Sequence, residues 1–103
     1  MDYRFESLQV NVLEWAKDKN LLKPENANQQ FLKVIEEVGE LASGIAKKDE
    51  AETIDAMGDT LVTLIILSEQ LGLDPVECLR EAYEVIKNRT GKTINGTFIK
   101  NES

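Results

Sequence analysis

Apolar residues recur at spacings of three and four between Phe31 and Ile45, and this pattern restricts the fold more than any other feature of the chain. The repeating residues are Phe31, Val34, Ile35, Val38, Leu41, Ala42 and Ile45. Such spacing gathers apolar side chains on one face of an α-helix. Pro24 suits the first turn of that helix, and the polar run "KKDE" marks its end. We therefore predict an amphipathic helix with a core-facing apolar stripe.

Two more helices flank this one in the sequence. Apolar side chains from Tyr3 to Lys19 fall at helical intervals, and this segment is expected to end near Asn20. Asp49 is predicted to cap a further helix that reaches about Gln70. The glutamates that follow Asp49 support this start, because they lie in the first turn, where the helix dipole favours negative charge. The second half of that helix is apolar on all sides, which is typical of a helix covered by several neighbours.

A fourth helix is predicted after "LGLDPVE". Asp74 is expected to cap it, with a proline at the first helical position and Glu77 completing a capping box, and the helix should reach about Asn88. Behind it, Asn95-Gly96 lies between two short β-type runs and predicts a hairpin or ordered tail. We expect an all-α fold: a four-helix bundle with a short C-terminal hairpin, in one domain spanning residues 1–103.

Charge and composition exclude several classes of function. The net charge is −7, and residues 87–103 carry four cations against one anion, so residues 1–86 hold −10. An acidic body argues against nucleic-acid and anionic-membrane binding. The chain has no histidine and one cysteine, which excludes the usual zinc sites and nucleophilic Ser/His or Cys/His pairs. We expect a cytoplasmic protein without a signal peptide or membrane anchor, whose metal chemistry uses oxygen ligands for Mg²⁺ or Mn²⁺.

Three glutamates interrupt the apolar helix at "VIEEVGEL". On a helical wheel with Glu36 at zero, the apolar stripe spans roughly 140° to 260°, whereas Glu37 lies near 100°, Lys33 near 60° and Glu40 near 40°. Glu37 and Glu40 therefore share a flank with Lys33 beside the stripe, and Glu36 points further toward solvent.

The third helix repeats this arrangement. Glu52, Asp55 and Asp59 fall in one row, and the row continues into Val62 and Ile66. A fully solvated face would not become apolar halfway along, so we expect the acid row to face protein, with the second helix as the candidate. Carboxylates from two helices would repel one another without a cation. From the residues alone, a divalent metal site and a solvated acidic surface are therefore both open interpretations.

The paired motifs "EEVGE" and "GDTLV" resemble the MazG-like, all-α nucleoside triphosphate pyrophosphohydrolases. Their signature is Glu-Glu-x-x-Glu on one helix, followed by Glu-x-x-Asp on the next helix. Glu36, Glu37 and Glu40 match the first motif, and Asp59 matches the closing aspartate. The similarity covers about residues 28–100 and is greatest to the short members from phages and Gram-positive bacteria.

One position departs from this pattern. The glutamate expected three residues before Asp59 is Ala56. Asp55 lies one turn from Asp59 in the same row, so it is our choice for the missing metal ligand. Glu52 with Asp55 also satisfies Glu-x-x-Asp, at a shorter separation from the first motif.

The resemblance implies hydrolysis of a (d)NTP to the monophosphate and pyrophosphate, with Mg²⁺ or Mn²⁺ as the only cofactor. It implies Glu37, Glu40, Asp55 and Asp59 as metal ligands, and Glu36 or Glu37 as acceptor of the proton from the attacking water. The candidates for binding the polyphosphate are Lys33, Lys87, Arg89, Lys92 and Asn95. Each of these cations is equally well interpreted as an ordinary surface charge.

The resemblance also implies a homodimer or homotetramer with sites near subunit contacts. Two alternatives stay open: a hydrolase of the same fold acting on dUTP, dCTP or phosphoribosyl-ATP, and a non-catalytic acidic helical module that binds a partner protein. Trp15 lies on an apolar stripe and is interpreted as core or subunit interface before base-stacking platform.

Overall fold

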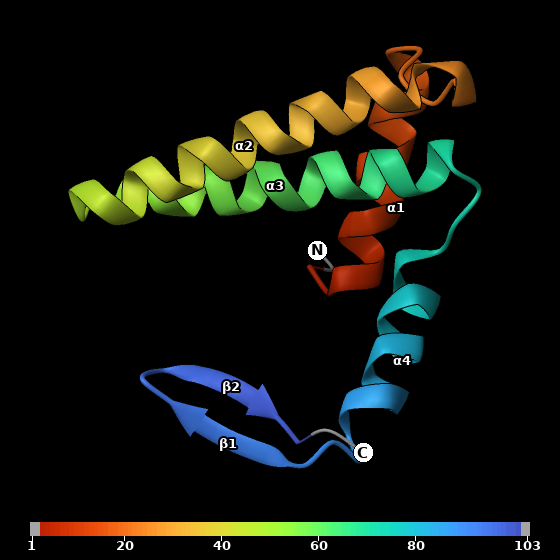
Figure 1. The fold of residues 1–103 in the computed structure, drawn as a ribbon. Helices are drawn as coiled ribbons and strands as arrows, with labels where there is room; N and C mark the ends of the chain where they lie inside the picture. Colours follow the sequence, from red (N-terminus) through yellow and green to blue (C-terminus); the bar gives the residue numbers. More distant parts are fainter. Residues whose placement is uncertain (1–2, 102–103) are drawn as a thin grey trace. The chain divides into compact units, whose positions relative to one another are not determined.

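The computed structural model describes residues 3–101, which fall into two compact units that divide between Leu73 and Asp74. The elements of the first unit are α1 (Phe5–Asp18), the short 3-10 helix η1 (Pro24–Asn26), α2 (Ala27–Lys47) and α3 (Glu50–Gln70). The second unit comprises α4 (Pro75–Ile86), β1 (Gly91–Ile94) and β2 (Thr97–Lys100) (Figure 1). The predicted all-α fold, with four helices and a C-terminal hairpin among the described residues, is confirmed. The single domain over residues 1–103 and the oligomer stay predictions.

Helices α2 and α3 lie side by side and run in opposite directions (Figure 1). The turn between them passes through Lys48, whose φ of 56° is left-handed. Asp49 then accepts a hydrogen bond from the backbone N–H of Glu52 at 3.1 Å, which satisfies one of the free donors at the start of α3. The predicted cap is therefore present, and α3 ends at Gln70 as expected. Helix α2 begins at Ala27 instead of Pro24, because the proline opens η1.

One row of side chains on each of these helices loses solvent exposure, at spacings of three and four, and we call the two rows the seam. The seam consists of Gln30, Val34, Glu37, Leu41 and Gly44 on α2, and Thr53, Ala56, Thr60 and Thr63 on α3. Gln30 donates a hydrogen bond from Nε2 to the backbone oxygen of Thr63 at 3.1 Å. The small side chains of α3 let the two backbones come close together.

The seam differs from the apolar stripe that the sequence predicted as core-facing. Val34 and Leu41 belong to both, but Phe31, Ile35, Val38 and Ile45 are exposed. The reason is geometric: one neighbouring helix covers only part of a helix circumference, and α3 covers the flank that carries Glu37. Within the first unit, helix α2 therefore presents a second apolar face that its neighbours leave uncovered.

Helix α1 packs against α3. Ala16 has no solvent exposure, and the segment after α1 is tied to the end of α3 by a 2.7 Å hydrogen bond from Gln70 Nε2 to the backbone oxygen of Leu21. Ile65 and Ile66 complete the small buried core of the first unit. This core fixes α1 beside the C-terminal half of α3.

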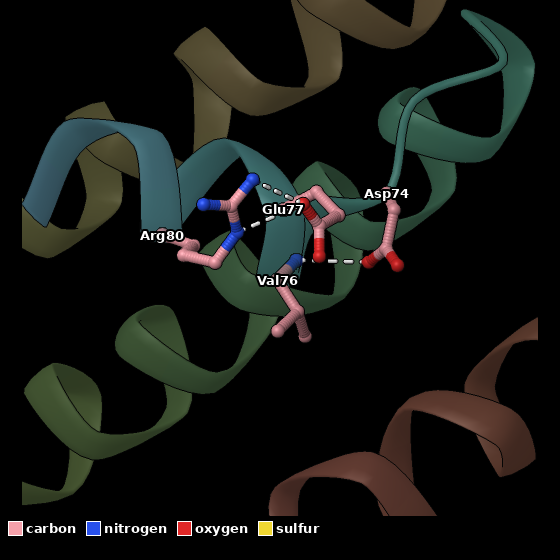
Figure 2. A network of polar contacts seen from close by, with 4 residues as sticks. All are labelled: Asp74, Val76, Glu77 and Arg80. Carbon is pink, nitrogen blue, oxygen red and sulfur yellow. Dashed lines mark hydrogen bonds and ion pairs between the residues drawn. The ribbon is translucent and has the colours of Figure 1, made fainter. Parts of the chain in front are cut away.

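The start of α4 is shown in Figure 2. The Asp74 carboxylate accepts a hydrogen bond from the Val76 backbone N–H at 2.9 Å, as expected for an N-cap. The predicted capping box is not formed, because the Glu77 carboxylate accepts from Nε and Nη2 of Arg80 at 3.0 and 2.9 Å instead. The charged guanidinium is a stronger donor than a backbone amide. Helix α4 ends at Ile86, slightly before the expected end at Asn88.

The C-terminal hairpin forms where it was predicted. Strands β1 and β2 are antiparallel, with Gly91 opposite Lys100. Asn95 and Gly96 both have positive φ, 51° and 79°, which a two-residue primed turn requires. Within residues 3–101 no single helix has both the length and the apolar content to cross a bilayer, although α3 and α4 taken together pass by length and composition.

Candidate metal and phosphate site

Glu37 is the most perturbed acidic group among the described residues. It lies on the seam, half-buried, and its Oε2 atom is buried with no hydrogen-bond partner within residues 3–101. Burial raises the pKa of Glu37, and the charges of Glu40, Asp59 and Glu36 raise this pKa further, while Lys33 lowers it. The carboxylate is thus held where its charged form is disfavoured.

The charges around Glu37 come from two helices. Glu40 is on α2, one turn further along, and Asp59 is on α3, half-buried. Asp59 on α3 therefore lies close enough to Glu37 on α2 for its charge to raise the pKa of Glu37 across the seam. We call Glu37, Glu40 and Asp59 the carboxylate cluster.

The carboxylate cluster offers oxygen donors only, which suits Mg²⁺ or Mn²⁺. A buried carboxylate oxygen without a partner, next to like charges, is unfavourable unless a cation or proton neutralises it. Within residues 3–101, no three acidic or cysteine side chains are already grouped closely enough to form a metal site. The oxygen donors fit a hard divalent ion chemically, and Glu40 is exposed.

The Ala56 position explains part of this geometry. Ala56 is 1% exposed on the seam, so the side chain that departs from the Glu-x-x-Asp pattern is buried against α2. Asp55, our choice for the missing ligand, is exposed. Glu52 is half-buried and forms a 3.8 Å ion pair with Lys47 across the α2–α3 turn. Within the acid row of α3, Glu52 and Asp59 therefore lie partly toward protein, and Asp55 faces solvent.

Two candidates on α2 are already paired with each other. Lys33 Nζ lies 3.4 Å from Glu36 Oε2, and both side chains are more than half exposed. An exposed pair of this kind contributes little to stability and leaves both groups accessible. Lys33 is near enough to the carboxylate cluster to lower the pKa of Glu37.

The remaining phosphate-binding candidates lie in the second unit. Lys87 is paired with Glu84, Lys92 is exposed on β1, and Asn95 forms the hairpin turn. Arg89 follows α4, where its backbone N–H bonds to the oxygen of Ile86. Each of these side chains is exposed, so each is available to a ligand.

Sequence reasoning missed two features of the first unit. Gly44 allows the close approach of the helices: a Cβ there would lie 2.8 Å from Thr53 Oγ1 and 2.9 Å from the Thr53 backbone nitrogen. Trp15, which was expected in the core or at an interface, is 52% exposed and lines a pocket with Val62 of α3. A helical wheel treats one helix at a time and contains no signal for either contact.

The fold and the seam define a mostly helical protein in which Glu37 of α2 is within electrostatic reach of Asp59 on the antiparallel α3. Residues 14–86 match the family model of phosphoribosyl-ATP pyrophosphohydrolase. The chain belongs to this family, within the MazG-like all-helical NTP pyrophosphohydrolase superfamily, as its acidic motifs indicated. The match includes the carboxylate cluster and Asp55, and it ends before Lys87.

A phage protein is also similar to this chain. The chain is 39% identical over 71 residues to an uncharacterized 18.2 kDa protein in the rep-hol intergenic region of Haemophilus phage HP1. The aligned part covers 69% of this chain and 44% of the phage protein, so the chain spans less than half the length of that relative. No solved structure matches the chain.

Proposed function

We propose that this protein is a Mg²⁺-dependent nucleoside triphosphate pyrophosphohydrolase that converts a (d)NTP to the (d)NMP and pyrophosphate. The observation that carries the proposal is the position of Glu37, whose buried Oε2 atom has no partner among the described residues and whose pKa is raised by burial, Glu40 and Asp59. Family membership supports the same reaction class.

The carboxylate cluster and Asp55 are the residues that would hold the ion. When bound, Mg²⁺ neutralises phosphate oxygens and lowers the pKa of a water that attacks the α-phosphorus. In the absence of the ion, Glu40 and Asp59 oppose ionisation of Glu37. The mutual repulsion of these carboxylates favours the binding of a cation by the cluster.

Proton transfer from the water is assigned to Glu36 or Glu37. Burial and the neighbouring carboxylates raise the pKa of Glu37, and a raised carboxyl pKa favours acceptance of a proton, whereas Glu36 is exposed beside Lys33 and stays outside the ligand set. Glu36→Gln and Glu37→Gln separate these roles. If the substituted side chain binds the metal, the Mg²⁺-induced rise in melting temperature should be abolished. If it acts only as the proton acceptor, kcat should fall and that rise should stay intact.

Lys33 is the polyphosphate-binding cation of the first unit, since it lies beside the carboxylate cluster. Lys87, Arg89, Lys92 and Asn95 are proposed as further contacts, and their exposure in a locally basic segment supports this.

Phosphoribosyl-ATP is the second candidate substrate, because the matching family model bears that name. The decisive assay incubates the protein and Mg²⁺ with canonical and modified (d)NTPs, dUTP, dCTP and phosphoribosyl-ATP, and separates pyrophosphate from orthophosphate. Pyrophosphate release from a (d)NTP supports the leading proposal, and release from phosphoribosyl-ATP alone replaces it. No release from any of them, with no Mg²⁺ stabilisation, favours a non-catalytic module.

Removal of single ligands tests the site within this enzyme. Glu40→Gln and Asp59→Asn are expected to lower turnover by at least about a hundred-fold, since each removes a charge that holds the ion. Parent protein should gain about 2.7 kcal/mol of stability at a Mg²⁺ concentration a hundred times the dissociation constant, and both variants should lose most of this gain. Unchanged turnover in both variants would reject the assigned ligands. Circular dichroism of each variant controls for folding.

We also propose that the protein works as a homodimer or homotetramer. The uncovered apolar face of α2 supports this, together with the exposed Met57, Leu61 and Leu64 of α3. A second copy of the chain would bury both faces in a helical bundle.

Ile35→Glu tests the oligomer, because it places a charge in the uncovered face of α2. It should shift the protein to monomer in sedimentation equilibrium, whereas Gln29→Glu, exposed on the same helix, should not. A parent protein that is already monomeric at micromolar concentration contradicts this part of the proposal.

A further inference from the structure

Threonines on the seam side of α3 hydrogen-bond to their own helix. The Thr60 hydroxyl donates to the backbone oxygen of Ala56 at 2.7 Å, and the Thr53 hydroxyl donates to the backbone oxygen of Asp49 at 2.7 Å. Each of these oxygens also accepts the backbone N–H of the same threonine, as the carbonyl four residues earlier in an α-helix does. A threonine in a helix has a second rotamer available. The Thr60 hydroxyl can therefore turn away from Ala56 without leaving that oxygen unpaired.

The register between α2 and α3 places Thr60 opposite Glu37. Near the turn that joins the two helices, Gly44 packs against Thr53, since a Cβ added to Gly44 would lie 2.8 Å from Thr53 Oγ1. Seven residues make nearly two helical turns and about 10.5 Å of rise. Because the helices are antiparallel, a step of seven residues away from the turn leads from this contact to Glu37 on α2 and to Thr60 on α3.

A contact at the far end of the seam has the same register. A second step of seven residues leads to Gln30 on α2 and to Leu67 on α3. Gln30 donates to the backbone oxygen of Thr63 at 3.1 Å, and a helical carbonyl points toward the residue four positions on, which here is Leu67. The contacts on both sides of Glu37 and Thr60 therefore agree on the pairing between them.

Glu37 needs a hydrogen-bond donor at this level of the seam. Its Oε2 atom is buried and has no partner within residues 3–101. On α3, Ala56 has no polar side-chain atom, and the charged Asp59 carboxylate only accepts hydrogen bonds. The Thr60 hydroxyl is a donor, and a bond to a charged carboxylate is about twice as strong as a bond to a neutral carbonyl. The turn of this hydroxyl from Ala56 to Glu37 is therefore favourable.

We propose that Thr60 is a positioning residue for Glu37, and that its hydroxyl donates to Oε2 of the charged carboxylate and holds it in one orientation. The inference rests on the proposed function, because it leaves the other carboxylate oxygen of Glu37 to the metal ion. Partners of this kind, which orient a metal ligand from behind, typically change metal affinity or activity by about ten-fold to a hundred-fold. The acidic motifs end at Asp59, so they assign no role to Thr60.

Mg²⁺ affinity is the first test, and it needs no nucleotide. Thr60→Val removes the hydroxyl and keeps the shape of the side chain, and it should weaken Mg²⁺ binding in calorimetric titration by about ten-fold to a hundred-fold. Thr60→Ser keeps the hydroxyl and should restore most of the affinity. Thr53→Val is the matched control: Thr53 is also half-buried and makes the same bond to its own helix, but it lies opposite Gly44. This control should bind Mg²⁺ as the parent does.

A double-mutant cycle in metal-free buffer at neutral pH is the second test. Thr60→Val should lower the melting temperature by at least about 5 °C more in the parent than in the Glu37→Met background, because only the parent loses a hydrogen bond to a carboxylate. The same cycle with Thr53→Val should be additive, since Thr53 is two helical turns away from the carboxylate. Additive effects of Thr60→Val and Glu37→Met overturn the inference.

The outcomes separate this inference from the proposed function. If the parent binds no Mg²⁺ and releases no pyrophosphate from any nucleotide, the proposed function fails, and the double-mutant cycle alone decides whether Thr60 holds Glu37. If the parent binds Mg²⁺ and Thr60→Val binds it equally well, the positioning role is rejected and the proposed function stands. An equal loss of Mg²⁺ affinity in Thr60→Val and Thr53→Val also rejects the role, because it assigns the loss to the helix and not to the hydroxyl opposite Glu37.

Discussion

Gly44→Ala should destabilise the protein, although alanine is the better helix former. The added Cβ would lie 2.8 Å from Thr53 Oγ1, 2.9 Å from the Thr53 backbone nitrogen and 3.2 Å from its Cα. Thr53 has little freedom to move, because its hydroxyl donates a 2.7 Å hydrogen bond to the backbone oxygen of Asp49, and its backbone N–H bonds to the same oxygen at 3.0 Å. The clash must therefore push α2 and α3 apart.

The size of the effect follows from two opposing terms. Overpacking of a close contact typically costs about 1–3 kcal/mol. Alanine in place of glycine in a helix interior contributes about 0.5–1 kcal/mol in the opposite direction. The two ranges leave a net loss of up to about 2.5 kcal/mol, or a fall in melting temperature of up to about 20 °C for a domain of this size.

Gly39→Ala is the matched control for this prediction. Gly39 is also inside α2, and a Cβ there meets no atom within 4 Å, so the variant should be more stable than the parent by about 0.5–1 kcal/mol. Urea and thermal denaturation followed by circular dichroism, at one protein concentration, measure both. A Gly44→Ala protein as stable as Gly39→Ala would refute the close approach of α2 and α3 at this end of the seam.

Two further changes test the seam. Glu37→Gln should be more stable than the parent at neutral pH without metal. Because the pKa of Glu37 is raised in the fold, the parent loses stability as the pH rises from the ordinary glutamate pKa through the raised one. Melting curves recorded across that pH range should show this loss in the parent and not in the variant. The prediction is contradicted if the melting temperature of the parent falls with pH no more steeply than that of the variant. Ala56→Glu should cost about 3 kcal/mol or more in metal-free buffer, because it adds volume and charge at a 1% exposed position, with Ala51→Glu at an exposed position of α3 as control. Equal unfolding midpoints for these two variants would show that Ala56 is not buried on the seam.

Local signals were sufficient to predict the α-helices and the hairpin of this fold, although not the short η1. Asp49 and Asp74 cap helices because a carboxylate is satisfied by nearby backbone N–H groups, and no tertiary contact is needed. Asn95 and Gly96 form the hairpin turn for the same local reason, since both tolerate positive φ. Glu77 was misjudged because Arg80, one turn further along, competes for its carboxylate.

Contacts between elements were beyond the reach of the same reasoning. The wheel identified Glu37 as the carboxylate nearest the apolar stripe, and Glu37 is indeed on the seam. The wheel did not contain the information that α3 would cover this flank instead of the middle of the stripe, because that depends on the small side chains α3 presents. The importance of Gly44 follows from the same close approach.

The placement of the seam links the fold to the proposed chemistry. A helix pair selected for stability alone would face its apolar stripe toward its partner, yet α2 turns Glu37 toward α3 and leaves Phe31, Ile35 and Val38 exposed. Such a conflict between local pattern and tertiary contact is expected where function imposes a cost. Here the cost is a buried carboxylate oxygen that has no partner in the part of the chain that the structure describes, and an uncovered apolar face. On the proposed function, a bound divalent ion would remove the first cost and a second copy of the chain would remove the second, so metal binding and self-association should each stabilise the same arrangement of α2 and α3.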